Sequence, residues 1–306
     1  MERPYILHMF TPGAQMSPFD VNMAADAGYQ VITPYCGVTL EQVTGLTQDA
    51  IFSRGPKGVA RTGIFIGGRD VLLAADMLER ARAALVPPFQ VSLFADPSGS
   101  YTTAAALVAA TEAALRRHHG LALRGLRVLL LGGTGTVGRI AGVLCAREGA
   151  TAVLSSHKGL AAAQAAAGQT GARFGVTLEA VSGHTDAERR AAIAEADVVM
   201  GVAAAGVQVM TAADRAIAAR LRVAADVNAV PPEGLAGVGV MDDGRPLEGT
   251  AAVGLGALAI GNVKYQVQHR LLVRMREAKP AVCFGFDDAF AVAREVLAGP
   301  AGGAGG

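Results

Sequence analysis

Residues 127–138 read RVLLLGGTGTVG, an apolar run that leads directly into a glycine-rich turn. Gly133, Gly135 and Gly138 match the spacing GxGxxG, and the chain that follows has the composition of a helix. In a strand–turn–helix unit these glycines allow a tight turn, let the backbone approach a pyrophosphate, and let the helix pack closely on the strand. The stretch therefore predicts a Rossmann-type nucleotide-binding unit. The residues that we expect to contact the cofactor are Gly133, Thr134, Gly135, Thr136, Val137 and Gly138.

The end of the following strand bears on the choice between NAD and NADP. NAD-specific folds carry an Asp or Glu there, roughly 20 residues after the glycines, which accepts a hydrogen bond from the ribose 2′-hydroxyl. This chain has Ser155, Ser156, His157 and Lys158 instead. This segment has no carboxylate that would repel a 2′-phosphate, and its lysine and two hydroxyls could bind one. The segment predicts that NADP is accepted, with the alternative that Lys158 is only a solvated loop residue.

Outside this unit, short apolar strands alternate with helical segments along most of the chain. Helices are expected at 17–27, 71–85, 102–117 and 262–279, with strands such as 62–67 between them. This alternation predicts a largely parallel sheet covered by helices. The predicted fold class is α/β, with a Rossmann-type NAD(P)-binding domain and an N-terminal α/β domain. We expect the N-terminal domain at 1–118, completed by C-terminal helices at 265–298, the nucleotide-binding domain at 119–264, and a disordered tail at 299–306.

The composition limits the class of protein. Of 306 residues, 51% are hydrophobic and 17% are charged, which excludes a generally disordered chain. The 27 Lys and Arg residues nearly balance the 26 Asp and Glu residues, for a formal net charge of +1. Such a chain has no overall electrostatic attraction for nucleic acids or acidic membranes. We expect neither as a partner.

Cysteine and histidine usage argues against a metal site. Cys36, Cys145 and Cys283 lie far apart and form no CxxC pair, and no histidines have ligand spacing such as HxxxH. Unpaired cysteines are typical of a reducing compartment. The first residues lack the apolar region of a signal peptide, and the longest apolar stretches are too short to span a membrane. We expect a cytoplasmic protein without a metal ion.

Polar residues gather where predicted strands end, which is where open α/β sheets bind ligands. Three such clusters follow strands or open helices, and a fourth candidate lies near the start of the helix at 262–279. The members are Ser17 and Asp20; Asp96, Ser100, Thr102 and Thr103; Asp226 and Asn228; and Lys264. A structural alternative stays open for several of them, because Ser17, Asp96 and Thr102 could cap helices and Lys264 could be solvated.

Several longer phrases resemble the methylene-tetrahydromethanopterin dehydrogenase family of methylotrophic bacteria. They include MSPFDVNMA at 16–24, FADPSGSYTT at 94–103, ADVNAVPP at 225–232 and GALAIGNVKY at 256–265. The resemblance covers nearly the whole chain. It implies an oxidoreductase of one-carbon metabolism that transfers a hydride from methylene-tetrahydromethanopterin to NAD or NADP, giving the methenyl form. It also implies a homo-oligomer of two-domain chains.

The resemblance further implies roles for the candidate residues. The pterin would lie in a cleft between the N-terminal, pterin-binding domain and the Rossmann-type domain, against the nicotinamide. Lys264 corresponds to the family's active-site lysine, and the segments of Asp20 and Asp96 line the pterin cleft. The expected catalytic residues are Lys264, Asp20 and Asp96, and the expected substrate contacts are Ser17, Ser100, Thr102, Thr103 and Asn228. Further cofactor contacts are expected from Asp226 and, near the nicotinamide ribose, from Ala203 and Ala204.

Two other functions stay open from the sequence. A folate-linked methylene dehydrogenase would act on a similar substrate. The bifunctional folate enzymes use a YxxxK lysine, however, and neither Tyr29 nor Tyr35 is followed by lysine at that spacing. A non-catalytic NADP-sensing protein could share the fold, because a fold does not determine function.

Overall fold

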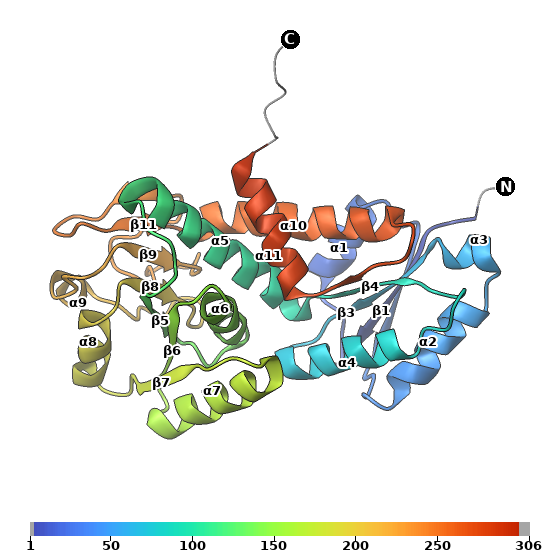
Figure 1. Cartoon of the computed structure of the whole chain (residues 1–306), viewed down its shortest axis with the longest axis horizontal. Coiled ribbons are helices and arrows are strands. Elements are labelled where there is room, and N and C mark those ends of the chain that lie inside the picture. The colour runs from blue at the N-terminus through green and yellow to red at the C-terminus, as the bar shows by residue number, and fades with distance from the viewer. Residues whose placement is uncertain (1–2, 300–306) are drawn as a thin grey trace, which may run out of the picture. The chain divides into compact units, whose positions relative to one another are not determined.

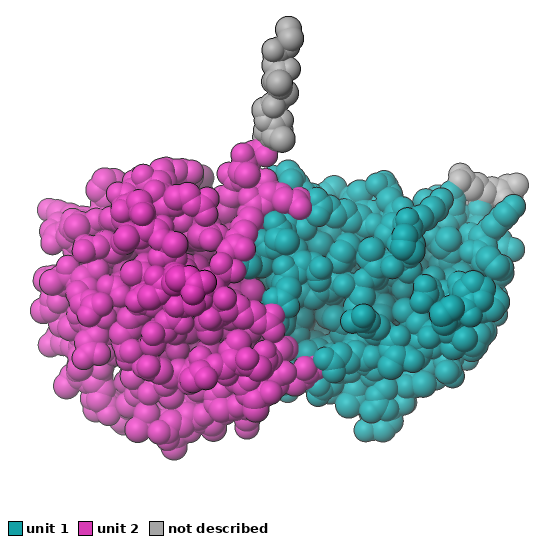
Figure 2. Space-filling model, viewed as in Figure 1, with its two compact units in different colours: residues 1–102, 265–292 teal, residues 103–264, 293–306 magenta. Residues whose placement is uncertain are grey.

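Two β-sheets flanked by helices make up the computed structural model, which describes residues 3–299 (Figure 1). The chain forms two compact units, one of residues 1–102 and 265–292 and the other of residues 103–264 and 293–306, less the residues that are not described (Figure 2). Within the described range, no helix combines the length and the apolar character needed to cross a membrane.

The first unit contains a five-stranded sheet in the order β12-β4-β3-β1-β2, with every neighbouring pair parallel. The central strand β3 and its neighbour β4 are buried along their whole length, as expected for a parallel sheet covered on both faces. The strands are β1 (Ile6–Thr11), β2 (Val31–Cys36), β3 (Thr62–Ile66), β4 (Ser92–Ala95) and β12 (Cys283–Phe284).

Local sequence signals explain where the helices of the first unit begin and end. Pro18 occupies the first turn of α1, and Gly28, with a φ of +87°, follows its end. The Asp70 carboxylate accepts hydrogen bonds from the Leu72 and Leu73 amides and so caps α4. The helices are α1 (Pro18–Asp26), α2 (Gln42–Phe52), α3 (Pro56–Val59) and α4 (Val71–Ala83), and a short 3₁₀ turn covers Pro97–Gly99.

Three helices contribute residues to both units. They are α5 (Ser100–His119), α10 (Ala257–Glu277) and α11 (Phe286–Ala298). The division between the units therefore falls inside helices rather than at loops. The domain ranges expected from the sequence stay a prediction. The expected tail at 299–306 lies outside the described residues except for Gly299.

The second unit contains a seven-stranded sheet in the order β10-β11-β9-β8-β5-β6-β7. All neighbours are parallel except the edge pair β10 and β11. Strand β5 lies between β8 and β6, and the chain order reverses direction there, as in a doubly wound fold. The strands are β5 (Arg127–Leu131), β6 (Thr151–Ser156), β7 (Glu179–Ser182), β8 (Val198–Gly201), β9 (Val223–Asp226), β10 (Asp243–Pro246) and β11 (Val253–Leu255).

Helices pack on this sheet over an apolar core. Leu129, Val153, Val199 and Ala224 belong to one buried cluster that crosses four neighbouring strands. Helix α6 packs against β5 and β6, and α7 packs against β6 and β7. The helices of this unit are α6 (Thr136–Arg147), α7 (Leu160–Phe174), α8 (Asp186–Ala194) and α9 (Ala212–Ala216).

The predicted α/β fold class, with a Rossmann-type sheet and a second parallel sheet, is confirmed. The expected helix at 262–279 is wrong in its start, because α10 begins at Ala257 and includes part of the glycine-rich segment. Lys264 therefore lies inside α10 and not near its start. Gly261 explains the error, since glycine disfavours helix interiors. A Cβ on Gly261 would nevertheless meet open space, so the helix passes through it without a clash.

Candidate dinucleotide and substrate sites

The glycine-rich turn follows β5 directly. Gly132 has a φ of +79°, in the left-handed region, and a Cβ on it would lie 2.6 Å from Ala203 Cα. The left-handed conformation of the tight turn thus belongs to Gly132, which lies before the GxGxxG pattern, and not to Gly133, the first glycine of that pattern. The Gly133 amide donates hydrogen bonds to Leu130 O (3.0 Å) and Ser155 O (3.1 Å). The turn is therefore joined to the end of the neighbouring strand β6.

The start of α6 packs tightly on this turn. A Cβ on Gly138 would lie 2.6 Å from Gly133 Cα, so only glycine allows this approach. The amides of Thr136 and Val137 lie in the first turn of α6, where α-helical amides have no partner within the helix and carry the positive end of the dipole. Arg139 Nε donates to Thr134 O at 3.0 Å and so holds the turn from inside the helix. Sequence reasoning missed Arg139.

The four residues at the end of β6 divide into two kinds. Ser155 and Ser156 are buried, and Ser156 Oγ accepts a hydrogen bond from the Lys158 amide at 3.1 Å. His157 and Lys158 are exposed. The hydroxyls thus lie inside the turn, whereas the basic side chains are available to an anion.

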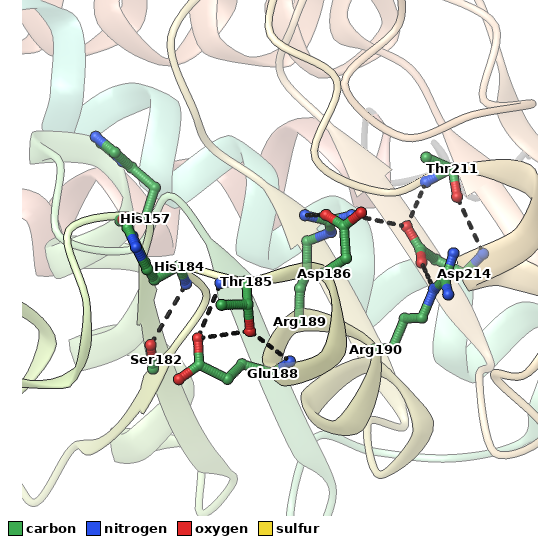
Figure 3. A network of polar contacts seen from close by, with 10 residues as sticks. All are labelled: His157, Ser182, His184, Thr185, Asp186, Glu188, Arg189, Arg190, Thr211 and Asp214. Carbon is green, nitrogen blue, oxygen red and sulfur yellow. Dashed lines mark hydrogen bonds and ion pairs between the residues drawn. The ribbon is translucent and has the colours of Figure 1, made fainter.

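The turn after β7 is bonded to the turn after β6. The Gly183 amide donates to Ser156 O (2.9 Å), and His184 Nδ1 donates to His157 O (2.9 Å). Figure 3 shows His157 and His184 side by side at the ends of these strands. Sequence reasoning found no metal-ligand spacing among the histidines and missed this contact of His184, because its partner lies 27 residues away.

A buried carboxylate connects α8 to α9. Asp214 Oδ1 accepts from Arg190 Nε at 2.8 Å, Asp214 Oδ2 lies 3.5 Å from Arg189 Nη2, and Thr211 and Asp214 form a capping box (Figure 3). Burial alone would raise the pKa of Asp214. The Thr211 amide, the Arg190 guanidinium and the charge of Arg189 outweigh burial and hold this pKa below its usual value. The contact fixes the end of the loop that leads from β8 to α9.

The loops after β8 and β9 are joined by one side chain. Asn228 Oδ1 accepts hydrogen bonds from the Gly206 and Val230 amides, both at 3.0 Å, and Asn228 Nδ2 donates to Pro232 O at 2.8 Å. Asn228 was expected to contact substrate. Its polar atoms hold the two loops together in the structure, and its contact with substrate stays a prediction.

Asp226 lies under these loops at the end of β9. Its carboxylate accepts hydrogen bonds from the Asn228 and Leu235 amides, both at 3.0 Å. Burial raises the pKa of Asp226, although these amides act in the opposite direction.

Ala203 and Ala204, which were expected near the nicotinamide ribose, lie in the loop that follows β8. The same pair of loops carries the exposed side chains of Val207 and Val230.

A pocket of about 840 Å³ opens within the first unit at the carboxyl ends of β1 and β3. It contains two of the predicted site residues, Ser17 and Asp20, which lie at the start of α1. Asp20 is 2% exposed, and Gln268 Nε2 donates to Asp20 Oδ1 at 2.8 Å. The remaining lining residues are Thr11, Pro12, Gly13, Ala14, Gln15, Pro18, Gly68, Arg69, Asp70, Leu73 and Ser98.

Asp96 follows β4 directly and contacts Thr102, which lies in the first turn of α5. Asp96 Oδ1 accepts from the Tyr101 and Thr102 amides (2.9 and 3.1 Å), and Asp96 Oδ2 accepts from Thr102 Oγ1 at 2.7 Å. Asp96, Ser100 and Thr102 are buried, whereas Thr103 is half-buried. These contacts match the capping alternative for Asp96.

Ser98, which sequence reasoning missed, lines the pocket with an unusual backbone. Its φ is +51°, a backbone conformation that residues other than glycine rarely adopt. Its Oγ donates a hydrogen bond to Gly68 O at 2.8 Å. Strain of this kind is concentrated at functional sites. Ser98 is therefore a further candidate substrate contact.

Lys264 is half-buried on α10. Residues four apart on a helix share a face, so Lys264 lies one turn before Gln268 on the same face of α10.

Among residues 3–299, no group of three or more His, Cys, Asp or Glu side chains is arranged to hold a metal ion.

Two solved structures share this fold. Ligand-free 5-ketofructose reductase from Gluconobacter matches with a TM-score of 0.53 at 16% identity, covering 96% of this chain and 99% of that chain. The NAD-dependent malic enzyme of Thermotoga maritima matches with a TM-score of 0.58 at 13% identity, covering 96% and 85%. At these identities the likeness shows the fold alone.

Sequence relatives are more informative. A profile described as methylene-tetrahydromethanopterin dehydrogenase, N-terminal, matches residues 18–98. The NAD(P)-dependent methylenetetrahydromethanopterin dehydrogenase of Methylorubrum extorquens is 50% identical over 291 residues, covering 95% of this chain and 98% of the relative. The bifunctional protein MdtA of the same organism is 34% identical with the same coverage. The resemblance seen in the sequence is confirmed, and the chain belongs to the methylene-tetrahydromethanopterin dehydrogenase family.

Proposed function

We propose that the protein is an NAD(P)-dependent methylene-tetrahydromethanopterin dehydrogenase that forms methenyl-tetrahydromethanopterin. The observation that carries this proposal is the 50% identity to the Methylorubrum enzyme over 95% of the chain. Neither alternative raised by the sequence, a folate-linked dehydrogenase or a non-catalytic sensor, receives similar support.

The residues of the second unit fit a dinucleotide. The first-turn amides of α6 and the close packing of Gly138 on Gly133 form a cradle in which a pyrophosphate can approach the backbone. Residues 155–158 lie where an NAD-specific fold would carry a carboxylate, so NADP is accepted. The related Methylorubrum enzyme is NAD(P)-dependent, which supports acceptance of NAD as well. When bound, the nicotinamide accepts the hydride. The loops held by Asn228 supply the apolar side chains of Val207 and Val230 beside it.

The pocket of the first unit supplies the substrate contacts. Loss of a hydride from a carbon between two nitrogens leaves a positive charge that both nitrogens share, so the step needs no general base. The buried Asp20 carboxylate stabilises that charge, because fixed charges act strongly where water is excluded. Ser17 and Ser98 contact the bound pterin, and Asp96 acts indirectly by fixing the start of α5.

Lys264 has a different role. A cation placed against a developing cation would oppose the reaction. Lys264 therefore orients the substrate by a hydrogen bond to the pterin or to a carboxylate, and the reacting carbons are held about 3–3.5 Å apart.

The remaining expectations belong to the same proposal. The protein works as a homo-oligomer in the cytoplasm, without a metal ion and without a nucleic-acid or membrane partner. The free thiols of Cys36, Cys145 and Cys283 agree with a reducing compartment.

The experiment that tests the proposal follows the reduction of NAD and of NADP with methylene-tetrahydromethanopterin and, in parallel, with methylene-tetrahydrofolate. We expect reduction of both dinucleotides with the methanopterin substrate. Reduction with the folate substrate alone would favour the folate-linked enzyme. Dinucleotide binding without reduction by either substrate would favour the sensor.

A further inference from the structure

Three basic side chains lie at the carboxyl ends of two neighbouring strands in the second unit's sheet. His157 and Lys158 follow β6, and His184 follows β7. The two strands are parallel neighbours, with Ser156 aligned with Ser182, so both turns leave the sheet at the same end. That end also carries the glycine-rich turn, because the Gly133 amide donates a hydrogen bond to Ser155 O, two residues before His157.

His184 connects the two basic turns. Its Nδ1 lies 2.9 Å from His157 O, and since a carbonyl can only accept, Nδ1 carries the hydrogen. The His184 amide is itself 3.4 Å from Ser182 Oγ. The imidazole is thus fixed by its own turn and fixes the backbone between His157 and Lys158.

The acidic side chains beside His184 are engaged by other partners. Glu188 accepts from the Thr185 amide and hydroxyl at 2.9 and 3.0 Å, and Asp186 lies 2.9 Å from Arg189 Nη1 (Figure 3). The Thr185 amide and the hydroxyls of Ser182 and Thr185 hold the pKa of Glu188 below its usual value, with a contribution from His184. These carboxylates are held within α8 and its cap, whereas His157 and Lys158 are exposed.

We propose that His184 is a positioning residue for NADP specificity. By holding His157 O it keeps the His157–Lys158 turn in the arrangement that receives a 2′-phosphate, and it does not contribute to binding the rest of the nucleotide. This inference rests on the proposed dinucleotide site and assigns a residue that the sequence motif does not include.

The test compares two probes, 2′,5′-ADP and 5′-AMP, by isothermal titration calorimetry. They differ by the 2′-phosphate alone. We expect His184→Ala to weaken 2′,5′-ADP binding about tenfold, the scale of one hydrogen bond involving a charged group, and to leave 5′-AMP binding unchanged. His184→Asn should restore 2′,5′-ADP binding, because its amide keeps a donor near the position of Nδ1.

His119→Ala is the matched control. His119 Nε2 makes a similar 2.9 Å contact, to Arg222 O, elsewhere in the same unit. We expect it to change neither affinity. The inference would be overturned if His184→Ala changed both affinities alike or neither, or if His184→Asn bound 2′,5′-ADP as weakly as the alanine variant. A wild-type protein that binds 5′-AMP but shows no gain from the 2′-phosphate would also overturn it. If the wild type bound neither probe, the proposed dinucleotide site itself would be wrong.

Discussion

The side-chain amide of Gln268 donates a hydrogen bond of 2.8 Å to Asp20 Oδ1, joining two residues that lie 248 positions apart in the sequence. Both side chains are buried, so the contact fixes a carboxylate at the wall of the first unit's pocket. A buried carboxylate needs such a partner, because an unsatisfied charge in a low-dielectric environment is costly. Gln268 thereby orients the Asp20 carboxyl group.

This contact predicts a catalytic defect when Gln268 is removed. We expect Gln268→Ala to lower kcat by about tenfold or more, because Asp20 loses the donor that orients it. The KM for NADP should not change, since the dinucleotide residues lie elsewhere in the sequence. Steady-state kinetics with each substrate varied in turn would measure both effects. Gln266→Ala, two positions away and therefore on another face of α10, is the control. An unchanged kcat in Gln268→Ala would mean that the orientation of Asp20 by Gln268 does not contribute to catalysis.

Lys264 should matter for turnover and not for dinucleotide binding. We expect Lys264→Ala to lower kcat by about a hundredfold, because the substrate loses its orientation towards the nicotinamide. The dissociation constant of NADP should stay within about twofold. Lys57→Ala, at an exposed position in α3, controls for the loss of a lysine. Near-wild-type turnover in Lys264→Ala would exclude Lys264 from the catalytic residues.

The close approach of Gly138 to Gly133 predicts a loss of dinucleotide binding on adding one methyl group. A Cβ at Gly138 would lie 2.6 Å from Gly133 Cα, and backbone cannot yield as a side chain can. We expect Gly138→Ala to weaken NAD and NADP equally, by about tenfold or more. Gly168→Ala in α7 is the control, since a Cβ there meets nothing within 4 Å. That control should raise the free energy of unfolding by about 0.5–1 kcal/mol. Unchanged affinity in Gly138→Ala would contradict the proposed cradle.

Asp214 gives a pH-dependent contribution to stability. Because its pKa is lower in the folded protein than in the unfolded chain, its contribution is present above about pH 4 and is lost as pH falls through the depressed value. We expect Asp214→Asn to lower the free energy of unfolding at pH 7 by about 1–3 kcal/mol, and by less at pH 3. Urea unfolding at both values would measure this.

Asp186→Asn is the control for Asp214, because it removes a neighbouring carboxylate whose side chain is 75% exposed. Its effect should be below about 1 kcal/mol, as for other surface ion pairs. A destabilisation of Asp214→Asn that did not vary with pH would mean that packing, and not charge, is what Asp214 supplies.

The strand–turn–helix around residues 127–138 could be predicted because its signals are local. The apolar run, the glycines and the start of the helix follow one another within a dozen positions. The short strands β7, β10, β11 and β12 were missed, because strands of two to four residues show no periodicity and depend on their neighbours in the sheet.

The candidate site was predicted unevenly for a similar reason. Asp20 was found from a phrase at the start of a helix, but its partner Gln268 has no local signal, since the two meet only in the folded chain. Asn228 was identified as polar and well placed, yet sequence cannot show that its side chain would be used by the amides of Gly206 and Val230. Contacts between distant segments therefore have to be taken from the folded structure.

The most direct test of the central claim follows the hydride itself. Methylene-tetrahydromethanopterin carrying two deuterium atoms on the bridging carbon would be incubated with the protein and NADP, and the reduced dinucleotide analysed by mass spectrometry. The account predicts one deuterium in the reduced nicotinamide for each methenyl product formed. Reduced dinucleotide without deuterium, or no reduction at all, would contradict it.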